Sequence, residues 1–123
     1  MKKARTLAES FFYAISGIVY ALKTQRNIKI HFAATLLVII LSFVFKLSTI
    51  EISIVTITAA IVLTAEMINT AIEAVVDMFT QEYHPLAKVA KNVAAGAVLL
   101  SAINAVVVGY LIFYKKIAAL FGF

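Results

Sequence analysis

The order of apolar and polar residues along this chain predicts four helices. From about residue 5 to 25, apolar residues recur every three or four positions, and Glu9, Tyr13, Ser16 and Lys23 fall on the opposite face. This spacing is typical of an amphipathic α-helix. Because basic residues flank the segment at both ends, we expect it to lie on a membrane surface rather than to cross the membrane.

Three longer apolar segments follow, each close to the length of a membrane span. They cover about residues 30–46, 52–76 and 93–114. A transmembrane helix needs about 20 mainly apolar residues. The first segment is the shortest, and it reaches this length if His31 and Lys46 extend toward the interface. We expect a tight loop over residues 47–51 and a polar connection over residues 77–92.

Composition favours the same interpretation. Of the 123 residues, 63% are hydrophobic and only 14% are charged. A soluble domain of this size leaves too much of its area in water to hide so much apolar surface. The sequence therefore predicts a single all-α membrane domain, an N-terminal surface helix followed by three transmembrane helices. The chain has no cysteine, which excludes disulfides and cysteine-bound clusters.

The net charge of +5 is best explained by anchoring at a membrane surface. Basic residues cluster near the N-terminus, and Lys88 and Lys91 lie in the polar connection. Cytoplasmic loops carry an excess of Lys and Arg, so we expect both regions to be cytoplasmic. Lys115 and Lys116 then fall on the outer side, which counts mildly against this orientation.

The second apolar segment carries a polar stripe. Glu66, Asn69, Glu73 and Asp77 are spaced by three or four residues and share one helix face. Carboxylates within a membrane span are costly and usually mark function. Three interpretations follow from the residues alone: a structural polar seam, a proton- or cation-handling protein, and a catalytic site.

The depth of each polar residue bears on the catalytic interpretation. Glu66 lies deep in the segment, where it would serve as a general base, and Glu73 lies two turns nearer the cytoplasmic end. Magnesium takes one or two carboxylates and completes its shell with water and phosphate, while Lys91 would meet phosphate as a point charge. This layout suits phosphoryl transfer to a lipid alcohol. The sequence contains neither a P-loop nor a G-x-G-x-x-G motif, and His31 and His84 lack the spacing of a zinc site.

Three segments carry a resemblance to a known family. They are E-M-I-N-T-A-I-E-A-V-V-D at 66–77, E-Y-H at 82–84 and A-K-N-V-A-A-G-A-V at 90–98. In these segments the chain resembles the prokaryotic diacylglycerol kinases, a family that includes undecaprenol kinases. The resemblance extends over nearly the whole chain, because the surface helix, basic turn, spans and polar loop follow in the same order.

The resemblance implies an ATP-dependent lipid kinase of the bacterial inner membrane that uses Mg²⁺ and forms a homotrimeric helical bundle with shared active sites. Glu66 matches the catalytic base, and Asn69 lies on the same active-site face. The residues that match positions around ATP are Tyr13, Gln25, Glu73, Tyr83, His84, Lys91 and Asn92, with Glu73 and Gln25 at the metal. The T-Q-R-N turn at 24–27 and the 90–98 segment are more similar to undecaprenol kinases, so we expect undecaprenol as the substrate and otherwise diacylglycerol.

Two residues depart from the family pattern. Gln25 and Asn92 stand where the family usually has acids. An amide oxygen still ligates Mg²⁺, but it attracts the ion less than a carboxylate does. The hypothesis is weaker metal binding, or one metal ion where relatives bind two. A kinase homologue with reduced activity remains an alternative.

We therefore expect the Gln25→Glu variant to need less magnesium than the wild type, because it restores a negative charge at the metal. The measurement is the rate of ATP-dependent lipid phosphorylation over a range of free Mg²⁺ concentrations. An unchanged Mg²⁺ dependence in the variant would exclude the hypothesis.

Overall fold

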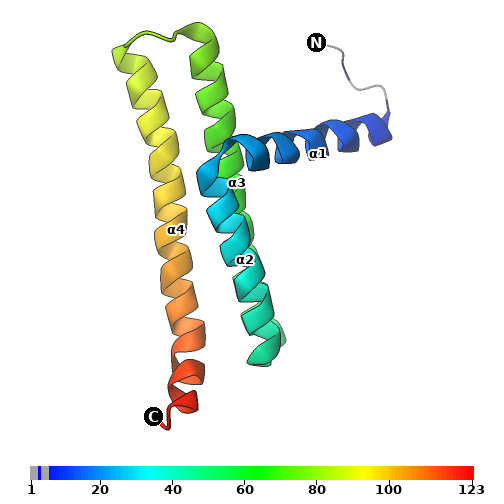
Figure 1. The fold of residues 1–123 in the computed structure, drawn as a ribbon, viewed down its shortest axis with the longest axis vertical. Coiled ribbons are helices and arrows are strands. Elements are labelled where there is room, and N and C mark those ends of the chain that lie inside the picture. The colour runs from blue at the N-terminus through cyan, green and yellow to red at the C-terminus, as the bar shows by residue number, and fades with distance from the viewer. Residues whose placement is uncertain (1–2, 4–5) are drawn as a thin grey trace.

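A computed structural model describes residue 3 and residues 6–123, and these residues form four α-helices without a β-strand (Figure 1). The helices are α1 (Leu7–Thr24), α2 (Arg26–Val44), α3 (Thr49–Phe79) and α4 (Pro85–Leu120). The predicted all-α class is confirmed. Residue 5, where the surface helix was expected to begin, lies outside the described residues.

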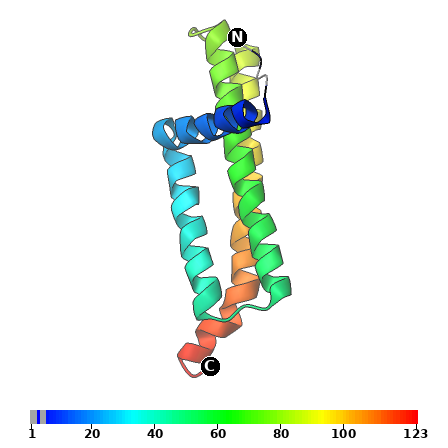
Figure 2. The same ribbon diagram turned by 90° about the vertical axis from the view of Figure 1, so that its right-hand side faces the viewer.

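The helices form an antiparallel bundle crossed by α1. Helices α3 and α4 make a long hairpin, α2 runs beside α3, and α1 lies almost perpendicular to them (Figures 1 and 2). Within the described residues, three helices, α2, α3 and α4, are long and apolar enough to cross a membrane. This confirms the expectation of one surface-type helix and three spans.

Helix α1 begins at a capping box and ends at a single extended residue. The Thr6 hydroxyl accepts a hydrogen bond from the Glu9 N–H, and the Glu9 carboxylate accepts one from the Thr6 N–H. These bonds satisfy two amides that a helix start leaves without partners. Gln25 then adopts φ −107° and ψ 120°. Because only this residue separates α1 from α2, the chain changes direction sharply there.

The turn between α2 and α3 differs from its predicted bounds. Helix α2 ends at Val44 rather than at residue 46, because Lys46 takes a positive φ of 50°. The Lys46 N–H bonds the Phe43 carbonyl, and the Leu47 N–H bonds the Ser42 carbonyl, which is the pattern of a Schellman motif. Ser48 caps α3, so residues 49–51 are helical and the predicted loop over 47–51 is wrong in its second half.

The predicted polar connection over residues 77–92 is also mostly helical. Helix α3 continues to Phe79, and α4 already begins at Pro85. His84 caps α4 by accepting a hydrogen bond from the Leu86 N–H at Nδ1, and proline suits the first position of a helix. The polar residues at 77–92 thus mark where the apolar spans end. Helices α3 and α4 themselves extend beyond these spans into the polar stretch.

Burial in this chain is the reverse of that in a soluble domain. Within the described residues, the buried hydrophobic side chains are Ala21, Ile28, Leu47, Val62, Ala94 and Phe113. The buried polar ones are Ser42, Thr58, Glu66, Asn69, Thr70 and Ser101. Most large apolar side chains are exposed on the helices. An apolar outer surface of this extent requires lipid or protein around it.

Candidate active site

The polar stripe on α3 is graded in burial. Glu66 is 1% exposed and Asn69 is 9% exposed. Glu73 is half-buried, and the Asp77 side chain is 49% exposed. The gradient arises because the four residues share one helix face but lie at successive depths, from the interior of the bundle to the end of α3. Only the inner two are removed from solvent by the chain's own packing.

Glu66 contacts a histidine from the neighbouring helix. Nε2 of His31, on α2, lies 3.2 Å from Oε1 of Glu66, and the two side chains are 24% and 2% exposed. The ring is not aligned for a hydrogen bond, and Glu66 Oε1 has no hydrogen-bond partner among the described residues. The sequence analysis considered His31 only as a zinc ligand and did not identify this contact. The signal that could have found it is a histidine in one apolar span and a carboxylate in the next.

Asn69 leaves a second buried acceptor without a donor. Its Nδ2 donates to Glu73 Oε1 at 3.2 Å, which fixes the direction of the amide. Its Oδ1 is buried and has no partner in the described part of the chain. Buried polar atoms are nearly always hydrogen-bonded in folded proteins. Two buried acceptors on one helix face, Glu66 Oε1 and Asn69 Oδ1, are therefore suited to a ligand that carries a hydroxyl group.

A polar hollow of about 440 Å³ lies at the connection between α3 and α4. Four of the residues predicted to surround a nucleotide line it, namely Tyr83, His84, Lys91 and Asn92. Lys91 Nζ lies 2.6 Å from Asp77 Oδ1. The sequence analysis assigned Asp77 to the stripe but did not identify this partner. The pair orients the ammonium group of Lys91 at the rim of the hollow, where an anionic ligand would meet it.

Two predicted site residues, Tyr13 and Gln25, lie away from this hollow. Tyr13 is 48% exposed on α1. Its ring packs edge to face with that of Phe12, with 5.8 Å between the ring centroids. Gln25 is half-buried between α1 and α2. Residues from both of these helices line a groove with Met67 of α3, so the junction lies beside the middle of α3. One copy of the chain therefore does not gather all predicted residues into one pocket.

The donor groups suit a metal ion that arrives with its own ligands. Among the described residues, no group of three or more His, Cys, Asp or Glu side chains is close enough to hold a metal. Glu73 offers one carboxylate, and Gln25 offers a neutral amide. Magnesium commonly takes one or two protein carboxylates and fills its other positions with water and phosphate. These residues fit that mode of binding.

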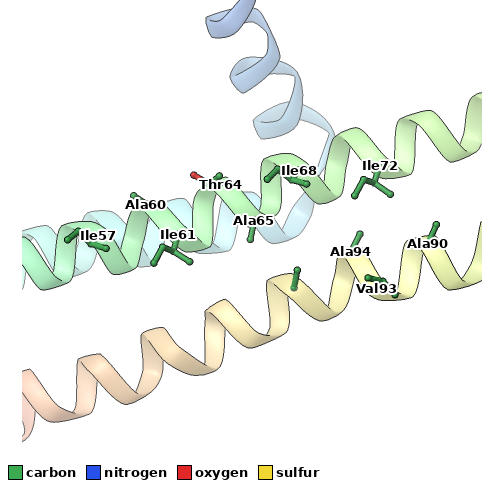
Figure 3. A pocket seen from close by; sticks show the side chains of 11 residues that line it. Ile57, Ala60, Ile61, Thr64, Ala65, Ile68, Ile72, Ala90, Val93 and Ala94 are labelled. Carbon is green, nitrogen blue, oxygen red and sulfur yellow. The ribbon is translucent and has the colours of Figure 1, made fainter.

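An apolar groove lies on another face of α3. It measures about 830 Å³ and runs between α3 and α4 (Figure 3). Isoleucines and alanines dominate its lining, including Ile57, Ile68 and Ala94, and Thr64 is its one hydroxyl residue. It offers no acid, base or charge for chemistry. The candidate active site is therefore the α3 stripe together with the hollow at its end.

Comparison with known proteins agrees with the family resemblance of the sequence. A family model for prokaryotic diacylglycerol kinase matches residues 12–113. The chain is 47% identical over 107 residues to a diacylglycerol kinase of Synechocystis sp., a match that covers 86% of this chain and 61% of that protein. It is 42% identical over 109 residues to an undecaprenol kinase of Bacillus subtilis, with 89% of each chain covered. A diacylglycerol kinase of Escherichia coli matches over 47 residues at 47% identity, 38% of each chain.

Proposed function

This chain belongs to the prokaryotic diacylglycerol kinase family, and we propose that it is an integral membrane kinase that phosphorylates a lipid alcohol with ATP. The observation that carries the proposal is the pair of buried acceptors, Glu66 Oε1 and Asn69 Oδ1, which have no hydrogen-bond donor in the described part of the chain. A lipid hydroxyl entering from the membrane would supply one. Glu66 would then be within reach of the proton that must be removed.

In the proposed reaction, Glu66 accepts the proton of the lipid hydroxyl while the oxygen of that hydroxyl forms a bond to the γ-phosphorus of ATP. The bond from that phosphorus to the β–γ bridging oxygen breaks, and ADP leaves. Phosphoryl transfer depends mainly on positioning and charge stabilisation. Asn69 would orient the hydroxyl, and Lys91 would neutralise charge on the phosphates. The order of burial along the stripe supports this division, because the base lies inside and Lys91 lies at the exposed end.

Magnesium and ATP belong to this proposal together. Glu73 would hold the metal with help from Gln25, and Tyr13, Tyr83, His84 and Asn92 would surround the nucleotide. Bound magnesium would neutralise phosphate charge. Since Tyr13 and Gln25 lie away from the hollow that holds the other residues, a complete site is easier to build between two copies than within one. This separation supports a homotrimer with shared sites.

We propose undecaprenol as the substrate, with diacylglycerol as the alternative. The match to the Bacillus undecaprenol kinase covers 89% of both chains, whereas that to the Synechocystis diacylglycerol kinase covers 61% of the relative. The 24–27 and 90–98 segments support the same choice.

We also propose that the N-terminus and the hollow face the cytoplasm. Lys116 lies 3.3 Å from Glu51, so one of the two lysines at the opposite end is paired with an acid. This weakens the objection that those lysines raise to the orientation.

We expect Glu66→Gln to lower the rate of lipid phosphorylation by at least about 100-fold, the usual contribution of a general base. The measurement is transfer of labelled phosphate from ATP to undecaprenol in detergent or vesicles. Glu51→Gln, the same change on the same helix, is the control and should retain activity. Turnover that persists in Glu66→Gln would remove Glu66 from the base role. Ion flux through vesicles without ATP would instead favour a cation-handling protein.

Replacing Lys91 should weaken the binding of ATP rather than the binding of the lipid. We expect Lys91→Met to raise the KM for ATP by about 10- to 100-fold, as hydrogen bonds to charged groups are worth about 1.5–3 kcal/mol. Lys115→Met removes the same charge from the opposite end of α4 and should leave this KM unchanged. Steady-state rates at varied ATP and saturating lipid measure both. An unchanged KM in Lys91→Met would contradict the assigned contact.

A further inference from the structure

The contact between His31 and Glu66 has no role in the reaction described so far. We propose that His31 is a positioning residue that holds the Glu66 carboxylate in the orientation required for phosphoryl transfer. The inference rests on the proposed function, because it concerns the base of that reaction. The imidazole Nε2 lies 3.2 Å from Oε1. A small rotation of the ring would align its N–H with the carboxylate, and catalytic hydrogen bonds are often poorly aligned before substrate binds.

The other residues around His31 offer the carboxylate no charged partner in the described part of the chain. Its side chain borders a cavity of about 100 Å³ between α2, α3 and α4. The α4 residues in the lining are Ala105, Val108, Gly109 and Phe113, all apolar. The lining hydroxyls of Thr35 and Thr58 donate to carbonyls of their own helices. Within the described residues, His31 is thus the only residue of this lining that can carry a charge.

The residues of α3 itself do not replace this contact. The Thr70 hydroxyl donates to the backbone carbonyl of Glu66 rather than to its carboxylate. The nearest acid along the stripe, Glu73, is bonded to Asn69 and has the same sign of charge as Glu66. Among the described residues, loss of His31 would therefore leave the carboxylate without an opposite charge to fix its rotamer.

The expected consequence is a loss of turnover with little change in substrate binding. His31 touches the base and is not among the residues assigned to ATP, so its loss should lower kcat and leave the KM for ATP unchanged. A displacement of about 1 Å in a catalytic group costs as much as about 100-fold in rate. A residue with a purely structural role would instead lower the amount of folded protein.

Three substitutions separate these roles by the reach of the side chain. In His31→Gln, the amide nitrogen stands as far from Cβ as Nε2 of the imidazole, so it still donates to Glu66. In His31→Asn, the same amide is one carbon shorter and falls short. His31→Leu removes the donor altogether.

Thr58→Val, which changes the same cavity from α3, is the matched control. Rates of phosphate transfer are normalised to the folded fraction, measured by size-exclusion chromatography and thermal unfolding in detergent.

We expect Gln to keep kcat within about threefold of the wild type, and Asn and Leu to lower it by about 10- to 100-fold with an unchanged KM for ATP. Thr58→Val should match the wild type. The proposal is overturned if Asn and Leu retain wild-type kcat, or if folded Gln is as slow as folded Asn. Should Leu fail to fold, the comparison of Gln with Asn decides. A wild-type chain without turnover on either lipid overturns the proposed function instead, and this inference with it.

Discussion

A carboxylate buried in a long apolar helix is costly, because the surrounding groups do not replace the water that the charge loses. Glu66 meets this cost with one contact, to His31 of α2, and its Oε1 has no aligned hydrogen bond in the described residues. A site that stabilised the charged carboxylate fully would leave it with little tendency to accept a proton. The incomplete satisfaction of Glu66 is therefore the constraint on which the proposed chemistry depends.

The arrangement of the helices follows from this constraint. Helix α2 packs beside α3 and brings His31 to the buried Glu66. Helix α4 supplies an apolar wall to the cavity that His31 borders. The stripe becomes more exposed toward Asp77, where Lys91 borders a polar hollow. One helix thus links an interior suited to a lipid hydroxyl with an end suited to phosphates. A lipid kinase must join these two environments.

The periodicity of the sequence predicted the surface helix, the three spans and the shared face of Glu66, Asn69 and Glu73, because these features follow from local spacing. Helix ends were less predictable: Lys46 closes α2 with a positive φ, and Pro85 begins α4 within a polar stretch that resembled a loop. The pairs His31–Glu66 and Asp77–Lys91 depend on how separate helices pack, which spacing within one helix does not determine. In the proposed homotrimer, the positions of Tyr13 and Gln25 relative to the nucleotide would depend on further copies of the chain.

The central claim is that this chain transfers phosphate from ATP to a membrane lipid alcohol. The most direct test offers the purified wild-type protein γ-labelled ATP and magnesium, with undecaprenol and diacylglycerol present together in equal amounts. The account predicts labelled lipid phosphate, most of it undecaprenyl phosphate. Label mainly in phosphatidic acid would correct the substrate alone. The absence of labelled lipid from a folded protein that binds ATP would contradict the account.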